Sequence, residues 1–176
     1  MAAENALAIS YGKLGEVHHS LGNTNEALTF YQAFNELFEK QYAAHPDSTD
    51  IKNGLATSFA KLGRTHGAMG DLTKAKFFYE KHHQLAKALH EELPDNLEMK
   101  ASFAVSHQNL GLMEEKLSKD YKTAQAFYQE YRRLGEELYE ASPENVDYKY
   151  LFANAHSYLG TTHSSLNDLT LALQNY

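Results

Sequence analysis

The chain has 176 residues, of which 43% are apolar and 22% are charged. This is enough apolar sequence for a folded core, which excludes wholesale disorder. The absence of cysteine excludes disulfide scaffolds and thiolate metal sites, and no apolar run approaches the roughly 20 residues of a membrane-spanning helix. The net charge of −7, with the ten histidines neutral, would repel a phosphate backbone. We therefore expect neither nucleic acid nor a membrane as a partner.

The first residues of the chain carry no export signal. They read Met1-Ala-Ala-Glu-Asn, without a basic segment followed by an apolar one. An acidic chain without cysteine also suits a reducing compartment. We therefore expect a cytoplasmic protein.

The sequence repeats itself with a step of 48 or 49 residues, and a fixed period of this kind decides the fold class. It predicts one repeat domain over 1–176, with units at approximately 1–47, 48–95, 96–144 and 145–176, the last truncated. Three features keep the step: a Leu-Gly pair, an alanine followed four residues later by tyrosine, and a proline. They are the Leu-Gly pairs at 14–15, 62–63, 110–111 and 159–160, Ala27 and Tyr31, Ala75 and Tyr79, Ala124 and Tyr128, Ala172 and Tyr176, and Pro46, Pro94 and Pro143.

Each repeat unit contains two predicted helices, because its apolar residues fall three or four positions apart. In the first helix, Leu7, Leu14 and Leu21 belong to the expected buried stripe, together with Tyr11 and His18. Side chains able to cap a first turn precede the later helices: Asn23, Ser48, Asp71, Asn96, Asp120, Asn145 and Asp168. We predict helices over 2–20, 24–44, 49–69, 72–92, 97–117, 121–141, 146–165 and 169–176, and no strand.

The third unit holds one extra residue. It falls between Gly111 and Ala124, where Ser118, Lys119 and Asp120 replace the tighter turns of the first two units. We interpret it as an insertion in the turn, which would leave both flanking helices intact.

Each Leu-Gly pair places a glycine inside a predicted helix, although glycine costs about 1 kcal/mol there relative to alanine. Because four glycines occupy the same position of the repeat, we expect a favourable interaction to offset this cost in each unit. We interpret that interaction as close contact between the two helices. Without a Cβ, the first helix can lie against the aromatic and alanine face of the second. The glycines are Gly15, Gly63, Gly111 and Gly160.

Three lysines also lie in phase, near the starts of first helices, where a cation opposes the dipole of its own helix. They are Lys52, Lys100 and Lys149. We expect acids at the end of the preceding helix, such as Glu91 or Glu140, to neutralise them.

The repeated residues resemble the tetratricopeptide repeat, in which an aromatic residue precedes Leu-Gly and the second helix carries alanine and an aromatic residue. Tyr11 and Phe59 fit the first aromatic position, where His107 and His156 depart from the pattern. The period exceeds the usual one of about 34 residues. We interpret the excess as one heptad added to each helix, which keeps the same face buried.

The resemblance implies an all-α fold: an α-solenoid of antiparallel helix hairpins, wound as a right-handed superhelix of about 3.5 to 4 repeats. Long-helix arrays of this sort look like those in large bacterial signalling proteins.

Neither the first nor the last helix has the polar face of a terminal cap. We therefore infer a segment of a longer protein, whose uncapped repeat ends would permit a homodimer.

The ten histidines are the first candidates for chemistry. His18, His66 and His163 recur at one phase, so we interpret them as residues that pack between helices and that would make the array sensitive to acid. Residues seven apart, such as His156 and His163, lie about 10 Å apart along a helix, too far for one metal ion.

No nucleotide-binding, zinc-hydrolase or nucleophile motif occurs. We expect no enzyme, no metal and no cofactor.

The resemblance implies that first-helix residues facing away from the core line a concave groove. We expect Lys61, Arg64 and Asn109 to cluster near its middle, where they would hold an acidic side chain or a terminal carboxylate. The alternative is ordinary solvated charge. The predicted groove residues are Glu16, Asn53, Lys61, Arg64, Gln108, Asn109, Leu112, Tyr150, Asn154 and Tyr158.

These expectations favour a noncatalytic protein–protein interaction scaffold that binds a peptide or protein segment in the groove. The alternative is a regulatory sensor segment of a larger signalling protein, which would gate an attached effector domain. A protein or peptide is the expected partner in either case.

Overall fold

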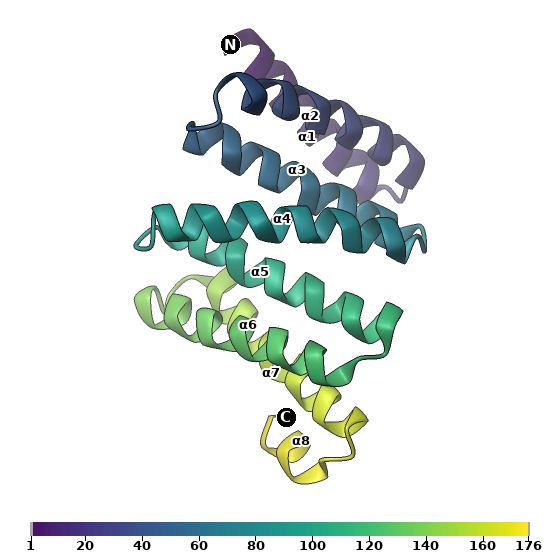
Figure 1. Ribbon diagram of the computed structural model, residues 1–176, viewed down its shortest axis with the longest axis vertical. Helices are drawn as coiled ribbons and strands as arrows, with labels where there is room; N and C mark the ends of the chain where they lie inside the picture. The colour runs from purple at the N-terminus through teal and green to yellow at the C-terminus, as the bar shows by residue number, and fades with distance from the viewer. Residues whose placement is uncertain (1, 176) are drawn as a thin grey trace. The chain divides into compact units, whose positions relative to one another are not determined.

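The computed structural model describes the backbone of residues 2–175, with the side chains of 4–168 and 172–175 (Figure 1). These residues form eight α-helices and a π-helix, and they contain no strand. The predicted all-α fold of antiparallel helix hairpins is confirmed. The helices are α1 (Ala2–Ser20), α2 (Thr24–Ala44), α3 (Thr49–Ala68), α4 (Leu72–Glu92), α5 (Leu97–Met113), the π-helix η1 (Glu114–Ser118), α6 (Tyr121–Ala141), α7 (Val146–Ser165) and α8 (Leu169–Asn175).

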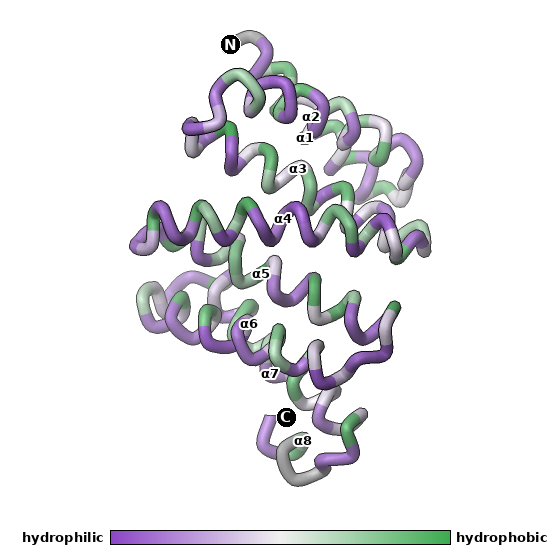
Figure 2. Tube along the Cα trace, viewed as in Figure 1, coloured by the Kyte–Doolittle hydropathy of each residue, from purple (hydrophilic) through white to green (hydrophobic). Residues whose placement is uncertain are grey.

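The chain divides into two compact units, Met1–Leu89 and His90–Tyr176. In the first unit α1 packs on α2, and α2 packs on α3; in the second, α5 packs on α6, α6 on α7, and α7 on α8. Figure 2 shows hydrophobic and hydrophilic segments alternating along each helix, as expected for amphipathic helices.

The first unit has its core between α1, α2 and α3. Phe34 and Phe38 of α2 lie edge to face, with ring centroids 5.0 Å apart, and pack with Leu55 and Phe59 of α3. Nearer the other end of the hairpin, Leu62 packs on Ala27 and Tyr31. The leucine of one repeat thus lies on the alanine and tyrosine of the preceding second helix.

The second unit repeats this arrangement. Leu159 of α7 packs on Ala124 and Tyr128 of α6. The other part of the core brings Ala104 of α5 and Ala155 of α7 against Tyr131, Leu134 and Leu138 of α6. The recurring leucine, alanine and tyrosine are therefore interface residues in both units.

The predicted close contact at the repeated glycines is confirmed in three repeats. A Cβ built on Gly63 would stand 2.6 Å from the ring of Tyr79, and one on Gly111 would stand 2.6 Å from the ring of Tyr128. Gly15 lies equally close under Tyr31. The partner expected for Gly160, Tyr176, lies outside the described residues. Gly54, under the ring of Phe38, makes a further close approach that the repeat did not predict.

The prediction that Leu7, Leu14 and Leu21 are buried is wrong. They are 45%, 43% and 68% exposed, whereas Leu62, at the position of Leu14 in the next repeat, is 2% exposed. The two positions differ because α2 packs over Leu62, whereas among the described residues no second helix packs on the corresponding face of α1.

The interpretation of the extra residue as a turn insertion is also wrong. The turn itself is unchanged in form, because Lys119 adopts a φ of 57° where Gly70 adopts 82°. The additional residue instead widens the end of the preceding helix into η1, in which the N–H of Asp120 donates to the carbonyl of Glu114 at 3.1 Å. The hydrogen bonds of a π-helix run from residue i to i+5, so its turn holds one residue more than a turn of α-helix. Helix α5 therefore ends at Met113 rather than at residue 117.

Most of the predicted caps form. Ser48, Asp71, Asn96, Asp120 and Asn145 each accept a hydrogen bond from a backbone N–H in the first turn of the following helix. The prediction for Asn23 is wrong, because its side chain makes no capping hydrogen bond.

The three lysines at the starts of first helices differ from one another. The ammonium of Lys100 pairs with Glu137 at 2.9 Å, so an acid of the following helix α6 neutralises it, rather than the predicted Glu91 or Glu140. Lys52 is buried in α3, and Lys149 is exposed.

Candidate binding surfaces on the first helices

In the first unit, predicted groove residues of α1 and α3 meet above the end of α2. The ammonium of Lys61 pairs with Glu16 Oε1 at 2.5 Å. It also lies 5.6 Å from the ring centroid of Tyr31. Arg64 Nη2 donates to the Tyr31 hydroxyl at 3.5 Å. We call Glu16, Tyr31, Lys61 and Arg64, with the neighbouring His19, the basic cluster.

The electrostatics of the basic cluster favour an anion. Burial lowers the pKa of His19, and the charges of Arg64 and Lys61 lower it further. The imidazole is therefore neutral at pH 7, and burial raises the pKa of Tyr31, which keeps its phenol protonated. Two cations and one carboxylate remain, so the cluster carries an excess of one positive charge in a protein of net charge −7.

Asn53 belongs to the same face of α3 but lies eight residues before Lys61, about 12 Å along the helix. Its side chain is half-buried. Asn53 is therefore separate from the basic cluster.

In the second unit, the corresponding surface is built from tyrosines and amides. The ring of Tyr158 stacks on that of Tyr128, with centroids 4.7 Å apart and planes 19° apart. Gln108 Nε2 donates to the Tyr158 hydroxyl at 3.1 Å. The two predicted residues thus meet across α5 and α7, on a buried aromatic support.

That support is anchored by a carboxylate of η1. Tyr128 donates its hydroxyl proton to Glu115 Oε2 at 3.1 Å, and Thr162 of α7 donates to Glu115 Oε1 at 3.0 Å. Burial, and next the charge of Glu115, raise the pKa of Tyr128 well above the ordinary value, so its phenol stays protonated. The widened helix end therefore ties α5, α6 and α7 together beneath the predicted surface.

The remaining predicted residues of the second unit are spread along its two first helices. On α7, Asn154 is half-buried and Tyr150 is 65% exposed. On α5, Asn109 and Leu112 are half-buried. Because Asn109 belongs to the second unit and Lys61 to the first, their expected grouping stays a prediction.

Tyr31, Tyr128 and Glu115 were not among the predicted groove residues. Tyr31 and Tyr128 are the repeat tyrosines, whose buried rings carry hydroxyls that reach the first-helix face. The sequence could have indicated this role for the two tyrosines, because the hydroxyl of a buried tyrosine usually has a polar partner. The role of Glu115 depends on η1 and had no comparable signal.

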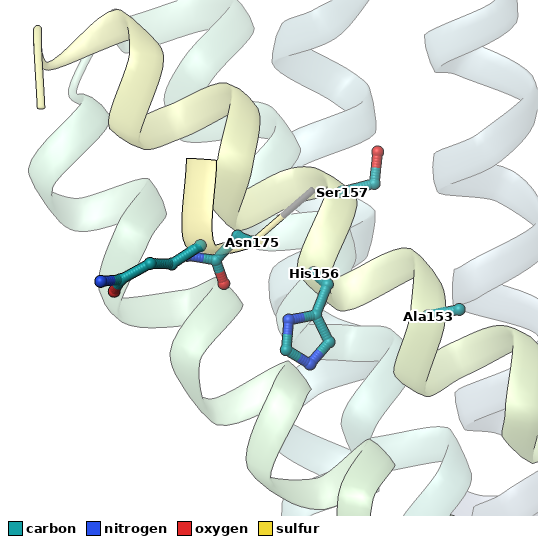
Figure 3. Close-up of a pocket in the computed structure, with 5 residues that line it drawn as sticks. Ala153, His156, Ser157 and Asn175 are labelled. Atoms are coloured by element: carbon teal, nitrogen blue, oxygen red, sulfur yellow. The ribbon is translucent and has the colours of Figure 1, made fainter. Parts of the chain in front are cut away.

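A cavity of about 420 Å³ lies between α7 and the end of α8. Figure 3 shows His156 and Ser157 leaving α7 in different directions, so their polar atoms do not converge. The ring of His156 instead packs edge to face on Phe152, with centroids 5.0 Å apart. The cavity is lined by Ala153, His156, Ser157, Gln174 and Asn175.

The residues that the structure describes hold no group of three or more histidine, aspartate or glutamate side chains placed to bind a metal ion. None of the described helices combines the length and the apolar character needed to cross a membrane.

Comparison with known proteins identifies the repeat. The tetratricopeptide repeat matches residues 8–41 and 56–81. The chain is similar in fold to the solved structure of BtubC (BKLC) from P. vanneervenii, with a TM-score of 0.75 and 16% identity over 98% of this chain. It is also similar to the apo form of RapI, with a TM-score of 0.72 and 14% identity over 96% of this chain.

The chain spans 61% of the length of the BtubC structure and 52% of that of RapI. No curated protein matches the chain.

Proposed function

Since the chain is a tetratricopeptide repeat protein, we propose that it is a noncatalytic protein–protein interaction scaffold. It binds a peptide or protein segment on the exposed faces of its first helices. The observation that carries this proposal is the basic cluster, in which Lys61 and Arg64 from one helix meet Glu16 from another over the hydroxyl of Tyr31. A partner carboxylate suits this site, because it accepts hydrogen bonds from both cations.

Binding of that carboxylate competes with an internal ion pair. Glu16 is 54% exposed in its side chain, whereas Lys61 is 17% exposed. The acid can therefore swing into solvent while the ammonium stays in place against Tyr31. Glu16 thus holds the ammonium in position for an incoming carboxylate and leaves when that carboxylate binds.

The second unit supplies a neutral surface for the same class of ligand. The stacked Tyr158 and the amide of Gln108 offer an aromatic face and hydrogen-bonding groups without net charge. Such groups suit the backbone and apolar side chains of an extended segment.

The test is selection from a displayed library of random peptides, followed by measurement of Kd by fluorescence anisotropy. We expect acidic or carboxylate-terminated peptides, and a loss of roughly tenfold or more in affinity for the Lys61→Glu and Arg64→Glu variants. Lys40→Glu and Lys74→Glu change exposed lysines of the same unit outside the cluster, and should leave Kd unchanged. Selected peptides that bind all four variants equally would refute the site.

We further propose that the exposed face of α1 pairs with a second copy of the chain. Leu7, Leu14 and Leu21 recur every seven residues, with Val17 between them, and all four are exposed. Leucine at this spacing is typical of helices that pack against a partner helix. The measurement is molar mass by light scattering: a dimer that Leu14→Glu converts to a monomer is expected, and a monomeric parent chain would refute it.

A further inference from the structure

A second cavity, of about 300 Å³, lies in the first unit on the side of the second helices. Its lining comes from α2, α3 and α4, and it does not include any residue of the basic cluster. The volume is at the lower end of the range for small-ligand sites, roughly 300–1,000 Å³. The lining residues are Glu39, Tyr42, Ala43, Leu55, Phe59, Lys81 and Gln84.

The floor of this cavity is apolar and rigid. Leu55 and Phe59 belong to the core of the first unit and are 4% and 5% exposed. Tyr42 packs against the same core from α2. The floor can therefore receive an apolar side chain at little cost in protein reorganisation.

The rim of the cavity carries charges of opposite sign that do not neutralise each other. Lys81 lies with its ammonium 5.0 Å from the ring centroids of Phe59 and of Phe77. Neither Lys81 nor Glu39 has an ion-pair partner among the side chains that the structure describes. One cation and one anion are thus available at the same opening, beside the amide of Gln84.

The lining of the opening includes one small residue of α2, Ala43. Ala43 occupies the position that Glu91 and Glu140 occupy in the next two repeats, at steps of 48 and 49 residues. A glutamate at this position would extend over the opening and bring a second negative charge to it. The residue at this position of the lining therefore differs between this repeat and the next two.

We propose that this cavity binds a free α-amino acid with an apolar side chain. The ligand carboxylate is held by Lys81 and Gln84, its ammonium by Glu39, and its side chain lies on Leu55 and Phe59. A cation and an anion beside an apolar floor favour a ligand that carries both an α-carboxylate and an α-ammonium group. A residue inside a peptide carries neither of these charges, and a residue at a peptide terminus carries only one.

The test is an NMR titration of the whole chain with L-leucine, followed through backbone amide shifts. We expect saturable shifts confined to residues near the cavity, and a Kd raised roughly tenfold by either Lys81→Gln or Glu39→Gln, since each removes one charge-assisted contact. Lys40→Gln and Glu36→Gln are matched controls on α2, outside the cavity lining, and should leave Kd unchanged.

Three further measurements complete the test. N-acetyl-L-leucine and L-leucinamide each lack one charge and should bind at least tenfold more weakly than L-leucine. Ala43→Glu, which introduces the residue of the neighbouring repeats, should abolish binding while leaving the melting temperature within a few degrees. Absence of saturable shifts, or equal binding of the acetylated and amidated compounds, would overturn the proposal; the latter result would indicate a side chain of a protein partner instead.

Discussion

Gly63 lies directly beneath the aromatic ring of Tyr79, so close that a single added carbon would stand 2.6 Å from the ring. Tyr79 is 6% exposed, which leaves its ring little room to move away. The contact joins the two helices of the second repeat through two positions that recur in all four units.

We therefore expect Gly63→Leu to lower the free energy of unfolding by about 3 kcal/mol or more through overpacking. Urea denaturation followed by circular dichroism measures the change. Gly67→Ala is the control on the same helix, because its added Cβ meets only Ala75, at 3.7 Å. That change should be neutral or stabilise by up to about 1 kcal/mol, and an unchanged midpoint for Gly63→Leu would refute the close contact.

Acid should destabilise the protein through His82, which is 2% exposed in α4. Burial, and next the charge of His83, lower the pKa of His82 from 6.5 to about 4. In the unfolded chain His82 is protonated below about pH 6.5, whereas in the folded chain it stays neutral down to about pH 4. The free energy of unfolding therefore decreases as the pH falls from 6.5 to 4. The shift corresponds to about 3 kcal/mol.

The measurement for His82 is the free energy of unfolding at pH 7.5 and at pH 4.5. His82→Leu should reduce the difference between the two values, because the unfolded variant has one proton fewer to gain. His45→Leu, in the exposed loop after α2, serves as the control. An equal pH dependence in the parent chain and His82→Leu would contradict the prediction.

Removal of the Glu115 carboxylate should loosen three helices at once. Glu115→Ala leaves the hydroxyl of Tyr128, a fully buried residue, without its acceptor. We expect a loss of about 1–3 kcal/mol in unfolding free energy. Glu115→Gln keeps an acceptor and should cost less, and the exposed Lys116→Ala should stay within about 0.5 kcal/mol. Equal stabilities of Glu115→Ala and Lys116→Ala would show that the network does not stabilise the fold.

Leucines at the same position of the repeat should differ in their contribution to stability. Leu62→Ala removes a side chain that is 2% exposed and should cost about 2–5 kcal/mol. Leu14→Ala removes one that is 43% exposed and should cost less than about 1 kcal/mol in the monomer. Thermal denaturation at low protein concentration gives both values. A similar cost for the two substitutions would contradict the exposure of the α1 face.

The helix bounds and the interface residues could be predicted because they depend on local spacing and on a period. Ala27, Tyr31 and Leu62 recur at fixed steps, and a step that repeats identifies a repeated contact. The exposure of Leu14 could not be predicted in this way, because it depends on whether a second helix packs on that face of α1, and among the described helices none does. A pattern of residues specifies which face is apolar, and not what lies against it.

The charged contacts were harder to predict than the apolar ones. Lys61 and Glu16 are 45 residues apart, close to but not equal to one repeat, so their pairing depends on how two helices cross. The acid that neutralises Lys100 likewise lies on the following helix rather than at the end of the preceding one. Long side chains reach over several ångströms, and sequence spacing alone does not decide which of several acids they meet.

The π-helix at the end of α5 has a consequence for how such arrays change over evolutionary time. Gly111 on one side of it still contacts Tyr128, and Asp120 on the other still caps α6. A single-residue insertion at this place thus disturbs neither boundary of the unit that receives it. Repeats of unequal length can then pack through the same contacts, so the contacts between helices identify a repeat more reliably than the number of residues in it.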